Sequence, residues 1–528
     1  MSTPSPRGVP SAMPRARVGL SVAIAAFLVY AALFIYRTSF VMDGTRYFSL
    51  FDDAMISMRY GRHLAGGLGL VWNPGERVEG YTNPLWVGFM ALVHLLPIPL
   101  AKTSSIVQVT AAILLALNLA IVHRIALAVA DASEAVALGA VVLTGWYLPL
   151  NNWSLQGMEV SLLVAIVSAS VWLCIRCLDG DDVVRGLYVL LGASTWVRPD
   201  MAVTLAAVAA FMIIVDAPRR RQHAVWGAGA FVLGLASQTL FRLWYFGAPF
   251  PNTYYLKMTG YPAVLRVARG AYVLVQFVWK ANPLLFAVVV ATFPWRDRRS
   301  WLLAFIVSVQ MAYSAYVGGD AWEYWGGANR YISIAMPAFF ILLSGRLHAI
   351  HPRRGGFVLL VAISVLSLNA IYGTGALEEW LLIKAPLHSG PGDENARDVE
   401  TAIALDRVSA PNASVGVTRA GTIPYFSERR GIDFLGKVDS RIAHEPSRVP
   451  GGARRFMDFR PGHSKWDDGY SIGELQPDVI VHVWNDPKEA APFLRDYRRY
   501  ALGPACVYVR VGSPRVQAGR LPPCRDAK

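Results

Sequence analysis

The chain is poor in cysteine and in charged residues. Its 528 residues include only four Cys, which excludes a small scaffold held together by disulfides. Charged residues make up 16% of the sequence, below the roughly 25% that is typical of soluble proteins. This low charge argues against a soluble enzyme. An aromatic content of 12% excludes a disordered chain, which would be poor in aromatic residues.

Apolar residues make up 54% of the chain and gather in uncharged runs long enough to cross a bilayer. The first run, 18–36, follows a stretch rich in Pro, Ser and Arg, 1–17, which we expect to be a disordered cytoplasmic tail. Ten more runs lie near 104–122, 134–150, 159–175, 186–198, 201–216, 224–245, 270–292, 301–317, 331–345 and 356–373. The sequence therefore predicts a mainly α-helical, polytopic membrane protein with about eleven transmembrane helices.

Basic residues indicate the orientation of these helices. Lys and Arg outnumber Asp and Glu by 50 to 36. Arg residues cluster in the short loops that eleven spans with a cytoplasmic N-terminus place in the cytoplasm, as at 219–221 and 296–299. The loop 37–103 then lies outside. Within it, 84–100 is apolar but short and broken by prolines, so we expect an interfacial or re-entrant helix. The basic balance does not by itself imply a nucleic-acid partner, and none is predicted.

The tail 375–528 differs in composition from the transmembrane region 18–374. It is charged and contains Pro, Gly and short β-rich runs at 413–418, 479–484 and 506–511. Roughly 150 residues suffice for one domain, so we predict a soluble α/β domain on the external side. Cys506 and Cys524 lie in this tail and could pair in an oxidising exterior.

Two adjacent carboxylates, Asp52 and Asp53, follow the first span closely. Charges near the membrane are costly unless they are used, so the pair indicates a functional site. The alternative is that one of them caps the helix that starts there. Further polar residues in the same external loop favour a site: Arg59, Glu76, Arg77, Glu79, Tyr81 and Asn83.

The loop also resembles a known family. The segments are Asp-Asp-Ala-Met-Ile-Ser-Met-Arg-Tyr at 52–60 and Gly-Leu-Gly-Leu-Val-Trp-Asn-Pro-Gly-Glu-Arg-Val-Glu-Gly-Tyr-Thr-Asn-Pro-Leu-Trp at 67–86. They resemble the terminal arabinofuranosyltransferases (AftB-like proteins) of the GT-C glycosyltransferase superfamily. The same similarity extends to 156–159, 198–200, 251–257, 318–320 with Arg330, 421–425 and 433–436.

The resemblance implies a reaction. Such enzymes transfer a sugar from a polyprenyl phosphate, with inversion, to a hydroxyl of a cell-surface glycan or glycoprotein. Here the resemblance implies D-arabinofuranose on decaprenyl phosphate, and an Asp of the first external loop as general base. We take Asp52 as the base, with Asp53 orienting the acceptor or pairing with a cation such as Arg59. The active site and C-terminal domain would then lie on the extracytoplasmic side of the cell (inner or plasma) membrane.

The remaining candidate residues are assigned by charge and position. The phosphate that leaves with the lipid develops negative charge, which fixed cations would stabilise. The candidates that bind the donor phosphate are Lys257, Arg198, Arg330, Tyr255 and Asn252. Candidates that contact the acceptor or support the site are Arg59, Glu76, Glu79, Tyr81, Asn83, Glu159, Asp200, Asp320 and Trp322. Instead of binding phosphate, Arg198 could snorkel at a helix boundary, Arg330 could be a topological anchor, and Lys257 could be a surface lysine.

Two alternative functions remain open. The donor could carry another sugar such as mannose, or the chain could be a transporter of lipid-linked sugars. Polar residues at helix ends on one face, without an internal repeat, favour an enzyme. The sequence has no metal-ligand pattern, so no cofactor is predicted to be required, although the Asp pair could hold Mg²⁺ or Ca²⁺ with waters.

Overall fold

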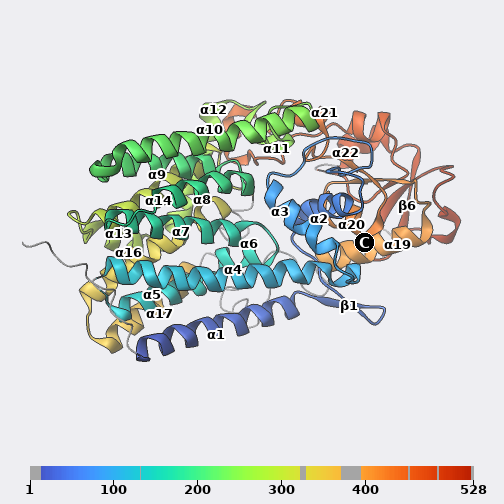
Figure 1. Cartoon of the computed structure of the whole chain (residues 1–528). Coiled ribbons are helices and arrows are strands. Elements are labelled where there is room, and N and C mark those ends of the chain that lie inside the picture. The colour runs from blue at the N-terminus through green and yellow to red at the C-terminus, as the bar shows by residue number, and fades with distance from the viewer. Residues whose placement is uncertain are drawn as a thin grey trace, which may run out of the picture.

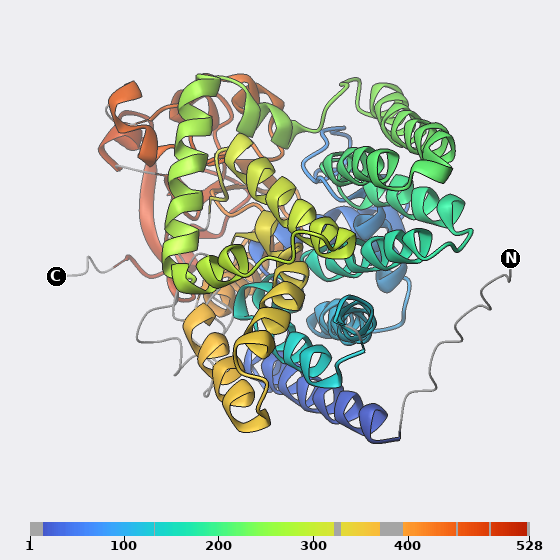
Figure 2. The same ribbon diagram turned by 90° about the vertical axis from the view of Figure 1, so that its left-hand side faces the viewer.

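A computed structural model of the chain describes residues 14–130, 132–321, 329–369, 394–449, 452–484 and 487–524. Trp322 and the end of the last predicted span, 370–373, lie outside the described residues. A long bundle of helices forms one part of the molecule and a C-terminal domain caps one end of it (Figure 1). Figure 2 views the bundle from its opposite end, where some helices are seen nearly end-on and others run across the view.

The helical region contains seventeen α-helices and one hairpin within the described residues before 370. The helices are α1 (Pro14–Arg37), α2 (Asp52–Ala65), α3 (Pro84–His94), α4 (Leu100–Val129), α5 (Glu134–Gly145), α6 (Leu148–Leu155), α7 (Val160–Leu178), α8 (Val184–Val197), α9 (Met201–Val215), α10 (Arg220–Tyr245), α11 (Asn252–Met258), α12 (Ala263–Lys280), α13 (Pro283–Ala291), α14 (Arg298–Tyr316), α15 (Arg330–Ser333), α16 (Met336–Ile350) and α17 (Arg354–Asn369). Strands β1 (Phe40–Met42) and β2 (Thr45–Tyr47) form the hairpin.

Helices occupy every predicted span, but only some are long enough to cross a bilayer alone. Among the described residues, four helical segments have the required length and apolar composition: Val18–Arg37, Leu100–Val129, Val160–Leu178 and Ala217–Tyr245. Helices α12 and α13 meet at 90° and give a fifth if they form one broken span. The total of eleven spans therefore stays a prediction, because shorter helices such as the 12-residue α5 reach only part of a bilayer.

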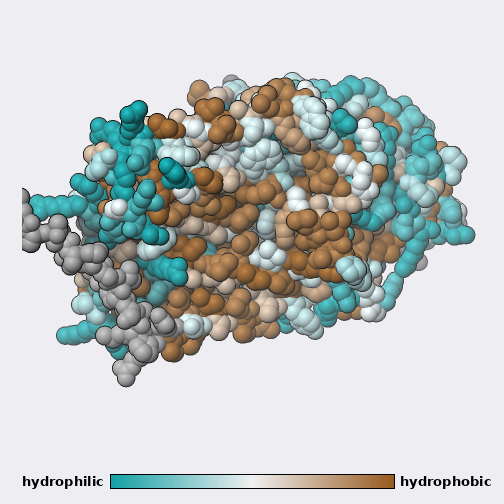
Figure 3. All heavy atoms as spheres, viewed as in Figure 1, coloured by the Kyte–Doolittle hydropathy of each residue, from teal (hydrophilic) through white to brown (hydrophobic). Residues whose placement is uncertain are grey.

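Apolar side chains cover the outside of the helical region. Leu233 is 72% exposed, Trp244 77% and Val264 80%, on helices α10 and α12. Hydrophobic residues cover much of the visible face of the bundle, while hydrophilic residues gather at its two ends (Figure 3). Such a surface is stable in contact with lipid and unstable in water, so the chain is a helical membrane protein.

Helix α3 covers the ambiguous stretch 84–100. It has 11 residues, about 17 Å of helix, which is too short to cross a bilayer. It packs against α2, and Leu92 in its last turn and Leu95 directly after it are each 64% exposed. This geometry fits an interfacial helix that supports α2 from the side.

The C-terminal domain is built on a five-stranded mixed sheet in the order β4-β3-β5-β7-β6. Strand β3 (Ser414–Val417) pairs in parallel with β4 (Arg430–Asp433) and β5 (Val479–Ile480). Strand β7 (Ala505–Arg510) is antiparallel to β5 and to β6 (Tyr497–Leu502). The described helices are α19 (Glu394–Val408), α20 (Thr422–Ser427), α21 (Ser440–His444) and α22 (Pro487–Ala490). Cys506 and Cys524 form a disulfide beside β6.

The domain is docked on α2 by close backbone approach and buried hydrogen bonds. Gly421 lies so near α2 that an added Cβ would sit 2.0 Å from the carbonyl oxygen of Asp52. Arg59 is buried and donates to the carbonyls of Trp72, Pro424 and Arg429. One continuous apolar core includes residues of both regions. The two regions therefore form a single packed unit around α2.

Candidate active site

The first turn of α2 sends its two carboxylates to different partners. Phe51 is the N-cap residue and makes no side-chain cap bond, so the helix-cap alternative is wrong for α2. Asp52 accepts hydrogen bonds from the backbone N–H groups of Gly421 and Thr422, at 3.2 and 2.9 Å, at the start of α20. Asp53 faces a cavity instead. Adjacent residues on a helix point apart, which explains why the two acids have separate environments.

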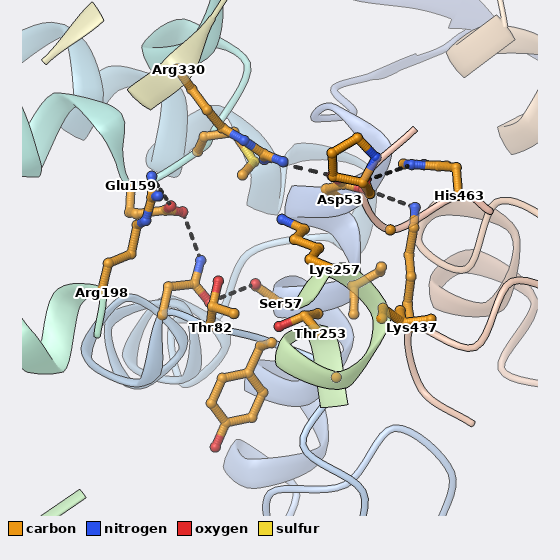
Figure 4. A pocket seen from close by; sticks show the side chains of 18 of the residues that line it. Asp53, Ser57, Thr82, Glu159, Arg198, Thr253, Lys257, Arg330, Lys437 and His463 are labelled. Carbon is orange, nitrogen blue, oxygen red and sulfur yellow. Dashed lines mark hydrogen bonds and ion pairs between the residues drawn. The ribbon is translucent and has the colours of Figure 1, made fainter. Parts of the chain in front are cut away.

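The cavity that Asp53 faces, called the central cavity from here on, lies between the helical region and the C-terminal domain (Figure 4). The polar residues that line it are Asp53, Ser57, Tyr81, Thr82, Asn83, Glu159, Arg198, Thr253, Lys257, Arg330, Tyr331, Lys437 and His463. The helical region contributes most of them, and the domain contributes Lys437 and His463.

Two cations hold the carboxylate of Asp53. Its Oδ1 lies 2.8 Å from Nζ of Lys437, and its Oδ2 lies 3.6 Å from a terminal nitrogen of Arg330. Burial alone raises the pKa of Asp53, but the charges of Lys437 and Arg330 outweigh burial and hold it well below the usual range. The same attraction outweighs burial at Lys437 and raises the pKa of its ammonium. Asp53 is therefore ionised in the resting cavity.

A second carboxylate, Glu159, lies at the opposite side of the cavity. It accepts a hydrogen bond of 2.9 Å from Asn83 and lies 3.5 Å from Arg198. Asn83 in turn accepts from Ser57, one turn along α2 from Asp53. Arg198 also pairs with Asp200 behind it. This chain of contacts fixes the guanidinium of Arg198 toward the cavity (Figure 4).

Arg330 is positioned by the preceding Gly-Gly-Asp segment. Gly318 and Gly319 have φ of +90° and +79°, a conformation that a side chain would strain. The turn brings Oδ2 of Asp320 within 3.2 Å of both Nε and the backbone nitrogen of Arg330. Asp320 is thus a buried counter-ion that aims Arg330, and it does not line the cavity itself.

Lys257 brings a positive charge that no described carboxylate neutralises. Its Nζ lies 3.3 Å from the hydroxyl of Tyr331, and none of the ion pairs between described residues includes it. Among the described residues, the cavity lining holds four basic side chains, Arg198, Lys257, Arg330 and Lys437, against two carboxylates, Asp53 and Glu159. Burial lowers the pKa of His463 to about 3, so this residue is neutral. The excess of positive charge suits an anionic ligand such as a phosphate.

Several predicted site residues lie outside the cavity lining. Glu79 pairs with Arg242 at 2.8 Å, and burial raises the pKa of Glu79. Glu76 forms a surface ion pair with Arg430. Arg59 faces the domain, so the predicted pairing of Asp53 with Arg59 is wrong, because Lys437 and Arg330 hold that acid.

Asn252 and Tyr255 were predicted to bind the donor, but neither lines the central cavity. Asn252 donates to the carbonyl of Lys437 and its neighbours, so it positions the loop that carries this lysine. The ring of Tyr255 packs on His444 in the domain. Both residues sit on the short helix α11, which also presents Lys257 to the cavity.

The sequence reasoning missed Lys437 and His463. A signal for Lys437 was present, because it directly follows the Asp-Phe-Leu-Gly segment at 433–436. His463 lies in a loop without a recognisable pattern, and only the docking of the domain brings it to Asp53.

The cavity does not fit a divalent cation. No cluster of three or more His, Cys, Asp or Glu suited to a metal is found among the described residues. Asp53 and Glu159 each face fixed cations, which would repel Mg²⁺ or Ca²⁺. No chemical step is therefore assigned to a metal.

The sequence is similar to those of two curated proteins. Two curated proteins named terminal beta-(1->2)-arabinofuranosyltransferase, from Mycobacterium tuberculosis and Corynebacterium glutamicum, are each 28% identical over 221 and 230 residues. Each match covers 38% of this chain and about a third of the relative, 34% and 32%. The resemblance stated from the loop motifs is confirmed.

Solved structures agree over almost the whole chain. ArnT from Cupriavidus metallidurans in the apo state aligns with a TM-score of 0.56 at 14% identity, covering 94% of this chain and 99% of that one. The Archaeoglobus fulgidus oligosaccharyltransferase in the apo form aligns with a TM-score of 0.55 at 11% identity, covering 95% and 75%. Both neighbours are GT-C glycosyltransferases.

The chain has the GT-C fold. A family model matches only residues 391–515, and its description is Domain of unknown function (DUF8728). This match lies within the C-terminal part of the chain that forms the soluble domain, which supplies Lys437 and His463 to the central cavity.

Proposed function

We propose that this chain is a membrane glycosyltransferase that transfers a sugar, D-arabinofuranose, from a polyprenyl phosphate to a hydroxyl of a cell-surface glycan or glycoprotein. The observation that carries the proposal is the central cavity, where the described lining holds the ionised Asp53, a second carboxylate, Glu159, and four basic side chains. A transfer with inversion requires these two features, a base for the acceptor and positive charge for the leaving phosphate.

Four charged residues of the central cavity have a role in this reaction. Lys257, Arg198 and Arg330 bind the donor phosphate and stabilise the charge that develops as the bond between the anomeric carbon and the phosphate oxygen breaks. The acceptor oxygen forms the new bond from the opposite side, and its proton passes to the carboxylate of Asp53. The phosphate leaves as polyprenyl phosphate.

The base is Asp53 in this proposal, not Asp52 as the sequence reasoning favoured. The carboxylate of Asp52 already accepts hydrogen bonds from the backbone N–H groups of Gly421 and Thr422. Asp53 faces the cavity, where its two oxygens lie beside the side chains of Lys437 and Arg330. Lys437 holds Asp53 ionised and in place before the acceptor arrives.

The nature of the donor is supported by the relatives and neighbours. Two relatives are named arabinofuranosyltransferases. ArnT has been solved bound to undecaprenyl phosphate, with a TM-score of 0.54 to this chain, and an archaeal oligosaccharyltransferase in complex with a dolichol-phosphate, with a TM-score of 0.51. Lipid-phosphate donors of this kind match the excess positive charge and the membrane setting of the cavity.

The cavity and the C-terminal domain are proposed to face the extracytoplasmic side of the cell membrane. The Arg-rich loops at the other end of the bundle support this orientation. The disulfide between Cys506 and Cys524 supports an oxidising compartment for the domain. A reporter that is active only in the cytoplasm should be silent when it is fused to the C-terminus. A bright reporter would show that the C-terminal domain lies in the cytoplasm.

The decisive experiment offers purified protein three donors: decaprenylphosphoryl-arabinofuranose, polyprenylphosphoryl-mannose and a nucleotide sugar. We expect consumption of the lipid-linked arabinose and transfer to an arabinofuranosyl oligosaccharide. Preference for the mannose lipid would change the sugar but keep the mechanism. Use of the nucleotide sugar alone would overturn the proposal.

A further inference from the structure

A second cavity lies between helix α12 and the C-terminal domain. It encloses about 580 Å³, and most of its wall on the domain side comes from the stretch between Arg448 and Trp466. We call it the basic cavity. Among the described residues, His463 is the one that lines both this cavity and the central cavity. The cations assigned to the donor phosphate therefore lie outside the basic cavity.

Arginine side chains dominate the charge of the basic cavity. Its described lining includes four arginines and one carboxylate, namely Arg269, Arg448, Arg455, Arg460 and Asp458. Asp458 lies 2.7 Å from Arg455 and balances that one charge. The guanidinium carbon of Arg448 lies 5.6 Å from the ring centroid of the buried Trp466, which orients it. Arginine binds phosphate oxygens through paired hydrogen bonds, so this lining suits a phosphate group.

Helix α12 presents one face to the basic cavity and another to the helical region. Arg269, Tyr272 and Gln276 lie three and four residues apart, so they share the face that lines the cavity. Gly270 packs against α14, where an added Cβ would lie 2.0 Å from the carbonyl oxygen of Ala315. This close approach fixes α12, and with it one wall of the basic cavity, on the helical region.

The third face of α12 is apolar and exposed. Val264, Val275 and Trp279 are 80%, 69% and 74% exposed on it. The helix runs across the view of Figure 2 and not along the bundle. A helix with an exposed apolar face and basic residues on another face is typical of a membrane surface. The basic cavity therefore lies next to the bilayer.

The wall between the basic cavity and the central cavity is a short segment of the domain, 460–464. Pro461, Gly462 and His463 line the central cavity, whereas Arg460 and Ser464 line the basic cavity. The hydroxyl of Ser464 accepts from the backbone N–H of Arg460 and donates to its carbonyl, each at 3.0 Å, which closes the segment into a turn. A ligand that contacts Arg460 therefore also acts on the wall of the central cavity.

We propose that the basic cavity binds the phosphodiester headgroup of an anionic phospholipid from the surrounding bilayer. The acyl chains lie along the exposed apolar face of α12, so two faces of one helix match the two parts of the lipid. Tyr272, which is 41% exposed, lies at the level of the headgroup, where aromatic residues are enriched. The lipid is distinct from the donor and holds α12, the domain and the segment 460–464 together at the membrane surface.

The test measures lipid binding without catalysis. Native mass spectrometry of the full chain in detergent compares phosphatidylglycerol with phosphatidylcholine of the same acyl chains, and we expect phosphatidylglycerol to bind more tightly. Arg448→Gln and Arg455→Gln should each weaken its binding by about fivefold, the scale of one basic residue at an anionic membrane surface. Arg498→Gln is the matched control, because Arg498 is exposed on β6 of the same domain and does not line the cavity.

Two further probes separate this phospholipid from other phosphates. Lys257→Ala should weaken the binding of decaprenyl phosphate and leave that of phosphatidylglycerol unchanged, whereas Arg448→Gln should do the reverse. Displacement of phosphatidylglycerol by inorganic phosphate at the same concentration would overturn the inference, because the cavity would then hold a free anion. Loss of decaprenyl phosphate from Arg448→Gln would assign the cavity to the donor and also overturn it.

Equal binding of the two phospholipids by the native chain would contradict the inference directly. So would phosphatidylglycerol binding by both cavity variants that is as tight as that of Arg498→Gln. The measurement involves no sugar transfer, so failure of the proposed reaction would leave the lipid result standing, and the two failures can be distinguished.

Discussion

The helical region and the C-terminal domain contribute to the central cavity in different ways. The helical region supplies Asp53, Arg198, Lys257 and Arg330 from four separate segments. The domain supplies Lys437, which makes the closest ion pair of Asp53, and Asn252 of the helical region holds the loop that carries Lys437. The difference shows that the helices provide three of the basic side chains in the described lining, whereas docking of the domain completes the surroundings of Asp53.

Asp53→Asn should produce the largest loss. We expect turnover to fall by about 10²–10⁴-fold, because the amide cannot accept the acceptor proton. Release of a labelled sugar from the lipid donor measures it. Glu76→Gln is the matched control, since Glu76 is 41% exposed and pairs only with residues outside the cavity. If Asp53→Asn is as active as Glu76→Gln, Asp53 is not the general base.

Lys257→Ala tests the phosphate side of the comparison. This change removes the cavity cation that lacks a described carboxylate partner, so kcat/KM for the lipid donor should fall by about 10²-fold. Inhibition by free polyprenyl phosphate should weaken in parallel. Lys280→Ala serves as the control, because Lys280 is an exposed lysine that does not line this cavity. If inhibition by free polyprenyl phosphate is unchanged, Lys257 does not bind the donor phosphate.

Lys437→Met tests the domain side through pH. In the native protein the pKa of Asp53 is held below its usual range, so activity should be flat from about pH 5 to 8 as far as this group is concerned. Loss of the Lys437 charge raises the pKa of Asp53, and the acid limb of kcat/KM should move to higher pH. The ion pair stabilises the fold above the unfolded pKa of Asp, about 3.9, and this stability is lost as pH falls through the lower folded pKa. An unmoved acid limb would show that Lys437 does not act on the base.

Asp52→Asn should have the smallest effect. An amide oxygen can still accept from Thr422 but without charge, so we expect a loss of about 1–2 kcal/mol in stability and only a few-fold loss of activity. The midpoint of thermal unfolding in detergent reports the first effect and turnover the second. A loss of activity as large as that of Asp53→Asn would contradict the separation of roles within this one turn.

The sequence by itself determined the membrane class, the position of the long apolar helices and the motifs that supply the helical side of the cavity. Uncharged runs form helices because a bilayer leaves backbone groups no other partners. Charged residues near the membrane cost free energy and therefore indicate a functional site. On this ground the sequence could indicate Asp53, Arg198, Lys257 and Arg330.

Only the tertiary structure decided which of these residues meet. Asp52 and Asp53 are equivalent in sequence, and their roles separate because Gly421 lets α20 approach one of them while Lys437 reaches the other. Glu79, Asn252 and Arg59 are as polar as the cavity residues, but buried partners from distant segments hold them elsewhere. Lys437 lies 384 residues from Asp53 along the chain. A pairing over such a distance depends on the packing of a whole domain, which local pattern cannot specify.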